Sequence, residues 1–336
     1  MTVALLLWPH QNVRYFASVQ ALALKEMALM LAAEPGASAP RAESLRGLAL
    51  ICFEVPALSE ELLAILSLFS AGYACFVREG DALLPIEVPA LPYGRDLSGV
   101  LKYKGKTNEM FTAMMINLAV FSSAFRGRFA QKLEILDPLC GRGTTLFEAA
   151  RRGYDAAGIE IDKADFSQIN LFLTKYLEHN RFKHSVQKAS LTVPGRPAVH
   201  SVRFEFAADA KALKDAPERL QFIHGDTLHA ASYFGRPRFH ALVADLPYGI
   251  AHESRDGKDK VALDQMMKKA LQAWKKALLP GAGVALSFNA HTLPLSQARA
   301  MLEAAGYEVL DGPETEGFAH WVEQAILRDI VLARAA

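Results

Sequence analysis

The sequence has few cysteines and no long uninterrupted apolar run, and each absence excludes a class of protein. The three cysteines (Cys52, Cys75 and Cys140) lie far apart and form no paired spacing. We therefore expect no zinc or iron–sulfur site and no bound metal, but free thiols in a reduced, cytoplasmic protein. The apolar stretch 21–33 contains Lys25 and Glu26 and is too short to span a bilayer. The apolar N-terminus lacks a basic leader and a cleavage site, so we expect neither signal peptide nor membrane partner.

The sequence also lacks an excess of positive or negative charge. The formal net charge is +1, and 22% of the residues are charged while 51% are hydrophobic. This balance predicts a well-packed core and neither supports nor excludes nucleic acid as a partner, so any basic footprint must be local. The length of 336 residues is typical of two domains.

The first ninety or so residues predict a small α/β unit. Apolar periodicity and turn residues indicate strands at 3–8 and 48–55, helices at 15–32 and from Ser59 to 69, and a hairpin of 73–77 with 83–88. This order is typical of a compact, ferredoxin-like sheet. The unit contains no catalytic group of residues of its own, and RNA binding is the role we consider for it.

The proline-rich segment 85–94 is the expected linker, so the predicted domains are 1–92 and 93–336. Beyond it, strands and helices alternate, which predicts a Rossmann-like parallel sheet with helices on both faces. The expected strands are 133–137, 155–160, 222–225, 241–245, 283–289, 307–310 and 326–333, with helices at 143–152 and 263–279.

The basic segment 181–203 interrupts this alternation. It carries arginines, lysines and histidines without an acidic residue, and Pro194-Gly195 divides it. It is either a solvated insertion or an arm that contacts phosphates beside the active site, and the sequence favours neither.

A glycine-rich loop follows the first strand of the second domain, from Asp137 to Thr145. Gly141 and Gly143 allow the backbone to approach a ligand closely, and the helix that follows presents free N–H groups. A dinucleotide loop starts in the same way, but Leu146 replaces its third glycine. Asp137 would repel a pyrophosphate and attract a cationic aminoacyl sulfonium, which favours S-adenosyl-L-methionine.

Further carboxylates end the neighbouring strands. Glu160 can accept both ribose hydroxyls of a nucleoside, and Asp226 can accept from an adenine amino group. A carboxylate at three successive strand ends is hard to explain by helix capping alone. The residues we expect to bind the cofactor are Asp137, Pro138, Cys140 (through its backbone), Gly141, Gly143, Thr144, Glu160, Ile161, Asp226, Thr227 and Thr107.

The segment Asp245-Leu246-Pro247-Tyr248 follows a buried strand and carries the predicted chemistry. An exocyclic amino group on a base is a poor nucleophile because its lone pair is delocalised into the ring. Acceptors at its hydrogens, here the Asp245 carboxylate and the Leu246 carbonyl, direct electron density back to nitrogen. Pro247 fixes the turn, and Tyr248 offers a face on which an extruded base can stack.

These motifs together resemble the amino-methyltransferases that carry an Asn/Asp-Pro-Pro-Tyr motif. Within that class the chain is similar to the THUMP-associated, UPF0020-type group of RNA guanine-N2 methyltransferases, which includes tRNA guanosine-10 methyltransferases. The resemblance implies a class I fold with a seven-stranded, mostly parallel sheet whose last strand is antiparallel. It also implies a cofactor-contacting element before the glycine loop, at 102–107 and 114–119 with Asn117. Leu246 in place of the first proline and a short N-terminal region depart from the group's pattern.

The resulting hypothesis is an S-adenosylmethionine-dependent RNA methyltransferase that binds tRNA and modifies guanosine N2. The alternatives are a DNA adenine-N6 or cytosine-N4 methyltransferase, a catalytically silent RNA-binding module and, least favoured, a dehydrogenase. Lys102, Lys104 and Lys106 are expected to line the cleft, with a basic solvent edge as the alternative, and His252 is a candidate for its mouth. The sequence does not determine the oligomeric state.

Overall fold

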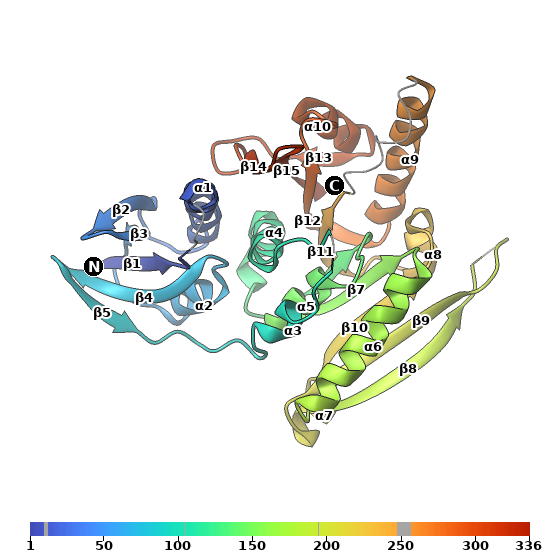
Figure 1. Ribbon diagram of the computed structural model, residues 1–336, viewed down its shortest axis with the longest axis horizontal. Coiled ribbons are helices and arrows are strands. Elements are labelled where there is room, and N and C mark those ends of the chain that lie inside the picture. The colour runs from blue at the N-terminus through green and yellow to red at the C-terminus, as the bar shows by residue number, and fades with distance from the viewer. Residues whose placement is uncertain (10–12, 104, 194, 247–256) are drawn as a thin grey trace.

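The computed structural model describes residues 1–9, 13–103, 105–193, 195–246 and 257–336, of which 13–17 and 257–265 are described by their backbone only. The chain folds around two sheets, one of five strands and one of ten. Figure 1 shows the smaller sheet with the N-terminus at one side and the larger sheet at the other, with α4 between them.

The smaller sheet is antiparallel, with the strand order β2-β3-β1-β4-β5. Its elements run β-α-β-β-α-β, the order of a ferredoxin-like fold, and β5 adds one edge strand; the sequence predicted this kind of sheet but with one strand fewer between the two helices. They are β1 (Thr2–Leu7), α1 (Val13–Leu31), β2 (Arg41–Leu45), β3 (Leu48–Glu54), α2 (Glu60–Leu68), β4 (Gly72–Glu79) and β5 (Ala82–Ile86).

Strand β2 is the element that sequence reasoning missed in this unit. It pairs with β3 through a two-residue turn in which Arg46 has φ 48° and Gly47 has φ 88°. A hairpin turn with positive φ at both central residues normally has Asn or Asp at the first of them, and arginine there hides the turn in the sequence. The cap of α2 is as predicted, because the Ser59 hydroxyl accepts from the Leu62 amide at 2.9 Å.

The larger sheet has the strand order β13-β15-β12-β11-β6-β7-β10-β9-β8, with β14 paired to β15. Its strands are β6 (Glu134–Asp137), β7 (Asp155–Glu160), β8 (Lys183–Leu191), β9 (Val199–Ala207), β10 (Glu218–His224), β11 (Phe239–Asp245), β12 (Leu278–Asn289), β13 (Tyr307–Val309), β14 (His320–Glu323) and β15 (Ile326–Ala335). The helices and 3-10 turns are α3 (Asp96–Gly99), α4 (Glu109–Ser122), η1 (Arg126–Arg128), α5 (Thr144–Arg151), α6 (Lys163–His179), α7 (Ala210–Asp215), η2 (Thr227–His229), α8 (Ala230–Phe234), α9 (Gly257–Lys275) and α10 (Leu295–Ala304).

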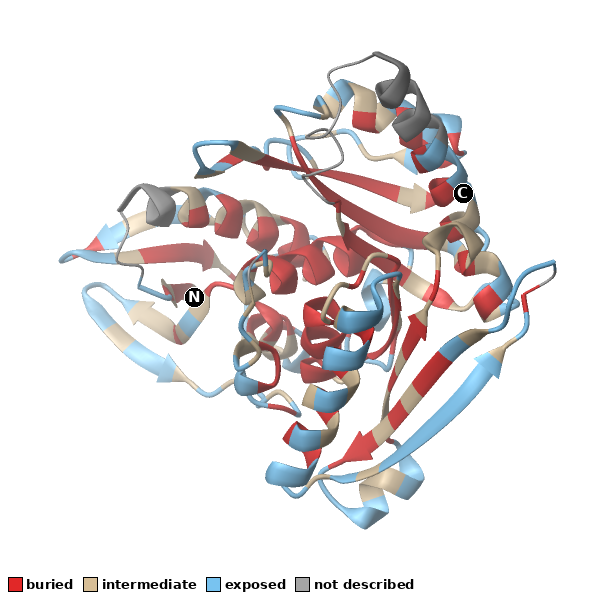
Figure 2. Cartoon of the chain, turned by 45° about the vertical axis from the view of Figure 1, so that its right-hand side comes forward, coloured by how far each residue is buried: buried red, intermediate tan, exposed pale blue. Residues whose placement is uncertain are grey.

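All seven strands expected for this sheet are present, and β15 is antiparallel to β12 as predicted. The expected total of seven is nevertheless too low, because β8, β9 and β14 extend the sheet to ten. The basic segment 181–203 forms much of the added hairpin. In β9, buried Val202, Phe204 and Phe206 alternate with Arg203 and Glu205, a strand pattern that the surrounding charges obscure. Figure 2 shows β8 as an exposed edge beside the partly buried β9.

Two predicted boundaries are wrong. The helix expected at 263–279 ends at Lys275, and Leu278 already belongs to β12. An apolar run such as 277–279 suits a buried strand as well as a helix, so periodicity does not distinguish them. Pro85 lies in edge strand β5 rather than in a linker. The expected domain boundary at residue 92 falls between β5 and α3.

Helix α4 is buried along almost its entire length and contacts α1 of the N-terminal unit on one side and β11, β12 and β15 of the larger sheet on the other. Its Asn117 donates to the Glu26 carboxylate in α1 at 2.6 Å and to the Leu68 carbonyl at 2.7 Å. Asn117 therefore joins the two units, whereas the sequence placed it on a cofactor-contacting element. On the other side, α4 approaches β12 so closely that a Cβ on Gly283 would lie 1.8 Å from the Ala119 carbonyl oxygen.

No helix in the described part of the chain is long and apolar enough to cross a membrane.

We predict that Gly283→Ala destabilises the fold by about 3 kcal/mol or more, because the new methyl group meets rigid backbone of α4. Gly127→Ala is the matched control, since a Cβ at Gly127 meets nothing within 4 Å. Urea unfolding of the two variants measures the difference. Equal midpoints would show that α4 moves away from β12 without cost.

Candidate active site

A cavity of about 470 Å³ opens at the carboxyl ends of β6 and β11, within the range usual for small-molecule sites. Ligands of open α/β sheets bind at this edge. The glycine loop after β6, the end of β11 and the first turns of α4 line the cavity. Asp137 and Asp245, which the sequence analysis singled out at different strand ends, are both part of its wall.

The glycine loop has the backbone that its sequence predicts. Gly141 has φ 51° and faces open space, while Gly143 has φ 86° and precedes the first residue of α5. The loop lies against β7, where the Cys140 amide donates to the Ile159 carbonyl at 3.0 Å. A Cβ on Gly158 would lie 2.6 Å from the Cys140 sulfur, so β7 requires glycine at this point.

Asp137 is a buried carboxylate at the start of this loop, with 4% of its surface exposed. It accepts from the Leu139 amide at 3.0 Å. The pKa of Asp137 is raised to about 7, mainly by burial and also by the negative charges of Asp245 and Glu160, while hydrogen bonds oppose the rise. No ion pair to Asp137 is formed within the described residues, so the negative charge favours a cationic ligand here.

Tyr103, Arg142 and Asp165 also line the cavity. Tyr103 and Arg142 belong to segments that the sequence predicts to contact the cofactor, although neither was named as a site residue, and Asp165 was missed. Arg142 pairs with Asp165 at 2.7 Å and lies over the Tyr103 ring at 4.7 Å. The Tyr103 hydroxyl lies 3.3 Å from the Thr144 hydroxyl at the start of α5. These contacts hold segment 101–103 against the glycine loop and narrow the cavity on that side.

The Asp245 carboxylate is held at both oxygens. Oδ2 accepts from the Thr107 hydroxyl at 2.6 Å, and Oδ1 accepts from the Ser287 hydroxyl of β12 at 2.8 Å. Arg328 of β15 reaches Oδ2 at 3.4 Å and lies over the Phe111 ring at 4.4 Å. Neither Ser287 nor Arg328 was predicted. The sequence signal that could have indicated Arg328 is a charged pair, Arg328-Asp329, within the mainly apolar strand β15.

Leu246 follows Asp245 and is 9% exposed in the cavity wall. Its amide donates to the Ser287 carbonyl at 2.8 Å, which fixes the backbone at the end of β11. Pro247, Tyr248 and His252 lie outside the described residues. Among the other predicted site residues, Cys140, Gly141, Thr107 and Thr144 also line the cavity. Burial raises the pKa of the Cys140 thiol well above its usual value.

The remaining predicted site residues do not line the cavity. Glu160, whose pKa burial raises, accepts from the Asp162 amide at 2.6 Å, and Ile161 is 70% exposed. Asp226 accepts from the Leu228 amide at 2.9 Å, and the Thr227 hydroxyl accepts from Trp274 at 2.7 Å. Pro138 and Gly143 belong to the loop but are likewise outside the wall.

The basic residues before α4 also differ from expectation. The Lys106 ammonium turns inward, donating to the Leu101 carbonyl at 2.8 Å and pairing with Glu109 at 2.6 Å. Lys102 is exposed and also pairs with Glu109, and Lys104 is outside the described residues. Within the described part of the chain, no group of three His, Cys, Asp or Glu side chains is arranged to hold a metal ion.

The Rossmann-like sheet, the glycine loop with its buried carboxylate and the Asp245-Leu246 pair at the end of β11 are the features that the sequence analysis expected of a class I methyltransferase. Residues 125–309 match the family described as UPF0020, RMKL-like, methyltransferase domain. The chain belongs to this family and is an S-adenosyl-L-methionine-dependent methyltransferase.

Solved structures with a similar fold include TrmN from Thermus thermophilus (13% identity, TM-score 0.47, 99% of each chain covered). Another is the rRNA methyltransferase aviRa from Streptomyces viridochromogenes (13% identity, TM-score 0.42, with 74% of this chain and 97% of that chain covered). A third is a TehB-like SAM-dependent methyltransferase from Corynebacterium glutamicum (13% identity, TM-score 0.36, 60% of this chain and 79% of that chain). No curated protein matches the sequence.

The buried Asp137 carboxylate predicts a pH-dependent stability. Its pKa rises from 3.8 to about 7 on folding, so the folded state favours the protonated form. Its contribution therefore destabilises the ligand-free protein increasingly as pH rises from about 4 to about 7. We expect Asp137→Asn to be more stable than wild type at pH 8 by on the order of 1 kcal/mol or more, since each pKa unit corresponds to about 1.4 kcal/mol.

Urea unfolding at pH 5 and pH 8 measures this difference, which should grow with pH. Asp215→Asn, at an exposed position in α7, is the matched control and should show no such trend. An Asp137→Asn variant that is less stable than wild type at pH 8 would contradict the assignment of an uncompensated buried charge.

Proposed function

We propose that this enzyme methylates an exocyclic amino group of a base in RNA, and that its substrate is the N2 amine of a guanosine in tRNA. One observation carries the proposal: the Asp245 carboxylate and the glycine loop after β6 line the same cavity. Methyl transfer requires its donor and acceptor sites to meet in this way. Membership of the UPF0020 family agrees with RNA as the substrate class.

In this proposal Asp245 binds the amino group of the base. The contacts from Thr107, Ser287 and Arg328 fix the carboxylate, so it need not reorganise when the base binds. A carboxylate has about four lone-pair positions and can accept from several donors, an amino group among them. The Leu246 carbonyl is the second acceptor, and the roles of Pro247 and Tyr248 in shaping the turn and stacking the base remain predictions.

The residues of the loop fit the cofactor that the family uses. S-adenosyl-L-methionine supplies a methyl group on a sulfonium, which is already activated for transfer. Asp137 provides a buried negative charge for the cationic part, and Gly141 leaves the space that a side chain would fill. The further proposed cofactor contacts are Pro138, Cys140 through its backbone, Gly143, Thr144, Glu160, Ile161, Asp226, Thr227 and Thr107.

The proposed domain division is 1–92 and 93–336, with the N-terminal unit contributing to RNA binding. An aspartate-led motif, rather than the asparagine-led form of many DNA enzymes, favours RNA over DNA. We propose tRNA processing in the cytoplasm as the setting.

Transfer of a labelled methyl group to unmodified tRNA, ribosomal RNA and DNA, followed by nucleoside analysis, tests the proposal. We expect N2-methylguanosine in tRNA, and a reduction in kcat of about 100-fold or more for Asp245→Ala, since removing one such hydrogen-bonding group costs this much elsewhere. Cofactor binding by calorimetry should persist in the variant. Label in DNA but not in RNA would refute the substrate class, and full turnover by Asp245→Ala would refute the catalytic role.

Thr107→Val tests whether the orientation of Asp245 matters. The substitution keeps the shape of the side chain and removes the 2.6 Å hydrogen bond, so kcat should fall about tenfold while KM for RNA stays nearly constant. Thr174→Val, which removes a hydrogen bond to the Asn170 carbonyl on α6, is the control and should retain full activity. Equal kcat values for the two variants would count against positioning by Thr107.

A further inference from the structure

A second cavity, of about 310 Å³, lies between the two units of the protein. We call it the arginine pocket. Trp8 and segment 67–70 line it from the N-terminal unit, and Arg95, Arg151 and Arg152 line it from the other. Among its lining residues, four cationic side chains face two carboxylates, which leaves a formal charge of +2.

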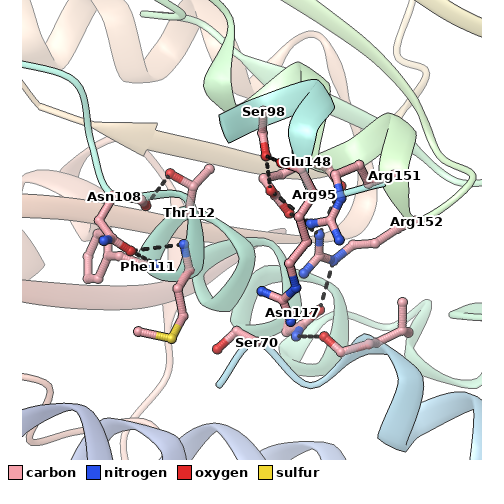
Figure 3. A network of polar contacts seen from close by, with 12 residues as sticks. Ser70, Arg95, Ser98, Asn108, Phe111, Thr112, Asn117, Glu148, Arg151 and Arg152 are labelled. Carbon is pink, nitrogen blue, oxygen red and sulfur yellow. Dashed lines mark hydrogen bonds and ion pairs between the residues drawn. The ribbon is translucent and has the colours of Figure 1, made fainter. Parts of the chain in front are cut away.

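The floor of the arginine pocket is a buried ionic network. Glu148, 1% exposed, accepts from Arg151 at 2.8 Å and from Arg152 at 2.6 Å, and its hydrogen bond to Ser98 ties α3 to α5. Figure 3 shows the two guanidinium groups at the Glu148 carboxylate, with Arg95 beside them. One carboxylate thus serves two arginines. The buried Nε atom of Arg151 has no hydrogen-bond partner among the described residues.

Arg95 lies at the exposed mouth of this pocket. No carboxylate of the described residues pairs with it; its guanidinium reaches the Gly72 carbonyl at 3.4 Å and lies over the Trp8 ring at 5.0 Å. Partial burial and the neighbouring charges of Arg151 and Arg152 lower the pKa of Arg95, against the opposing effect of Glu148. An anion at this point would offset the repulsion among the three arginines.

Two aromatic rings indicate what kind of anion fits. Trp8 is 37% exposed and Tyr73 is 56% exposed, and their rings meet edge to face with centroids 4.7 Å apart. A phosphate bound by Arg95 would bring the adjoining bases near these rings, and single-stranded nucleic acid is recognised by this combination of basic and aromatic side chains. A free inorganic anion would make no use of them.

The arginine pocket also has a defined relation to the active site. Asn108, Glu109, Met110 and Ala113 of α4 and its cap line the arginine pocket, whereas Phe111, Thr112 and Met115 line the active-site cavity. The two cavities therefore lie on opposite sides of one helix, and a helix with its side chains is roughly 10–12 Å across. One RNA strand can reach both.

We propose that the arginine pocket binds a backbone phosphate of the RNA substrate, with Arg95 as the phosphate-contacting side chain. This inference rests on the proposed function, since it takes RNA as the substrate. Arg151 and Arg152, which pair with Glu148, give the pocket its positive charge and fix its floor. The bound phosphate lies a few nucleotides from the base that enters the active site, so it contributes affinity and register without contacting the reacting atoms.

Fluorescence anisotropy with labelled unmodified tRNA over a range of salt concentrations tests the proposal. For Arg95→Gln we expect Kd to rise about tenfold and the slope of log Kd against log salt to become shallower by about one, because one phosphate contact is lost. In turnover, KM for RNA should rise with kcat unchanged. Arg128→Gln is the matched control: Arg128 also lies over an aromatic ring, Phe125, forms no ion pair among the described residues and is outside the pocket.

Values of Kd and salt slope for Arg95→Gln that equal those of Arg128→Gln would overturn the proposal while leaving the proposed function intact.

A second experiment uses inorganic phosphate alone. Wild type should broaden the phosphorus NMR signal of the phosphate and Arg95→Gln should not, and equal broadening by both proteins would overturn the assignment of Arg95 as the phosphate-binding residue. Failure of wild type to methylate RNA would instead end the proposed function. Equal affinity for 5′-phosphorylated and 5′-hydroxyl RNA identifies a backbone phosphate, whereas dependence on the 5′-phosphate assigns the pocket to the chain end and overturns the backbone assignment.

Discussion

The close contact between α4 and β12 sets the position of everything that surrounds α4. At Gly283 the helix lies directly on strand backbone, and Asn117 on another side of the helix binds Glu26 of the N-terminal unit. Burial raises the pKa of Glu26, and its hydrogen bonds from Ser70 and Asn117 oppose that rise. These contacts hold α4 from both sides, and its first turns form the wall between the active-site cavity and the arginine pocket.

The carboxylates at the sheet edge are stabilised unequally. Asp245 has a cationic partner in Arg328 and hydroxyl donors from Thr107 and Ser287, and so remains an acceptor of fixed orientation. Asp137 is more deeply buried and has no ion pair within the described residues. The buried charge of Asp137 lowers the stability of the fold, but it also attracts a positively charged ligand. Such destabilising groups are common at functional sites. At this sheet edge, Asp245 is therefore held in place as a hydrogen-bond acceptor, whereas the negative charge of Asp137 has no positive partner among the described residues.

Local sequence signals predicted much of the fold and several residues of the cavity wall, Asp137 and Asp245 among them. The glycine loop, the Ser59 cap and the strand that ends at Asp245 carry their signals within a few residues. Arg328 lies 83 residues from Asp245 along the chain, and Ser287 belongs to a neighbouring strand, so no local pattern links them to it. The β2 turn was missed because arginine occupies a position with positive φ. Asn117 and Lys106 were misplaced because polar residues near a site can equally serve internal packing.

Strand β8 gives the large sheet its outer limit. An edge strand presents unpaired backbone groups that can template association with another chain, and the nine residues of β8 form such an edge. The side chains of β8 are mostly exposed and polar, with Lys183 and Lys188 along the edge. Lysines on such an edge repel a second copy brought alongside, so the hairpin that lengthens the sheet also keeps it from growing between molecules.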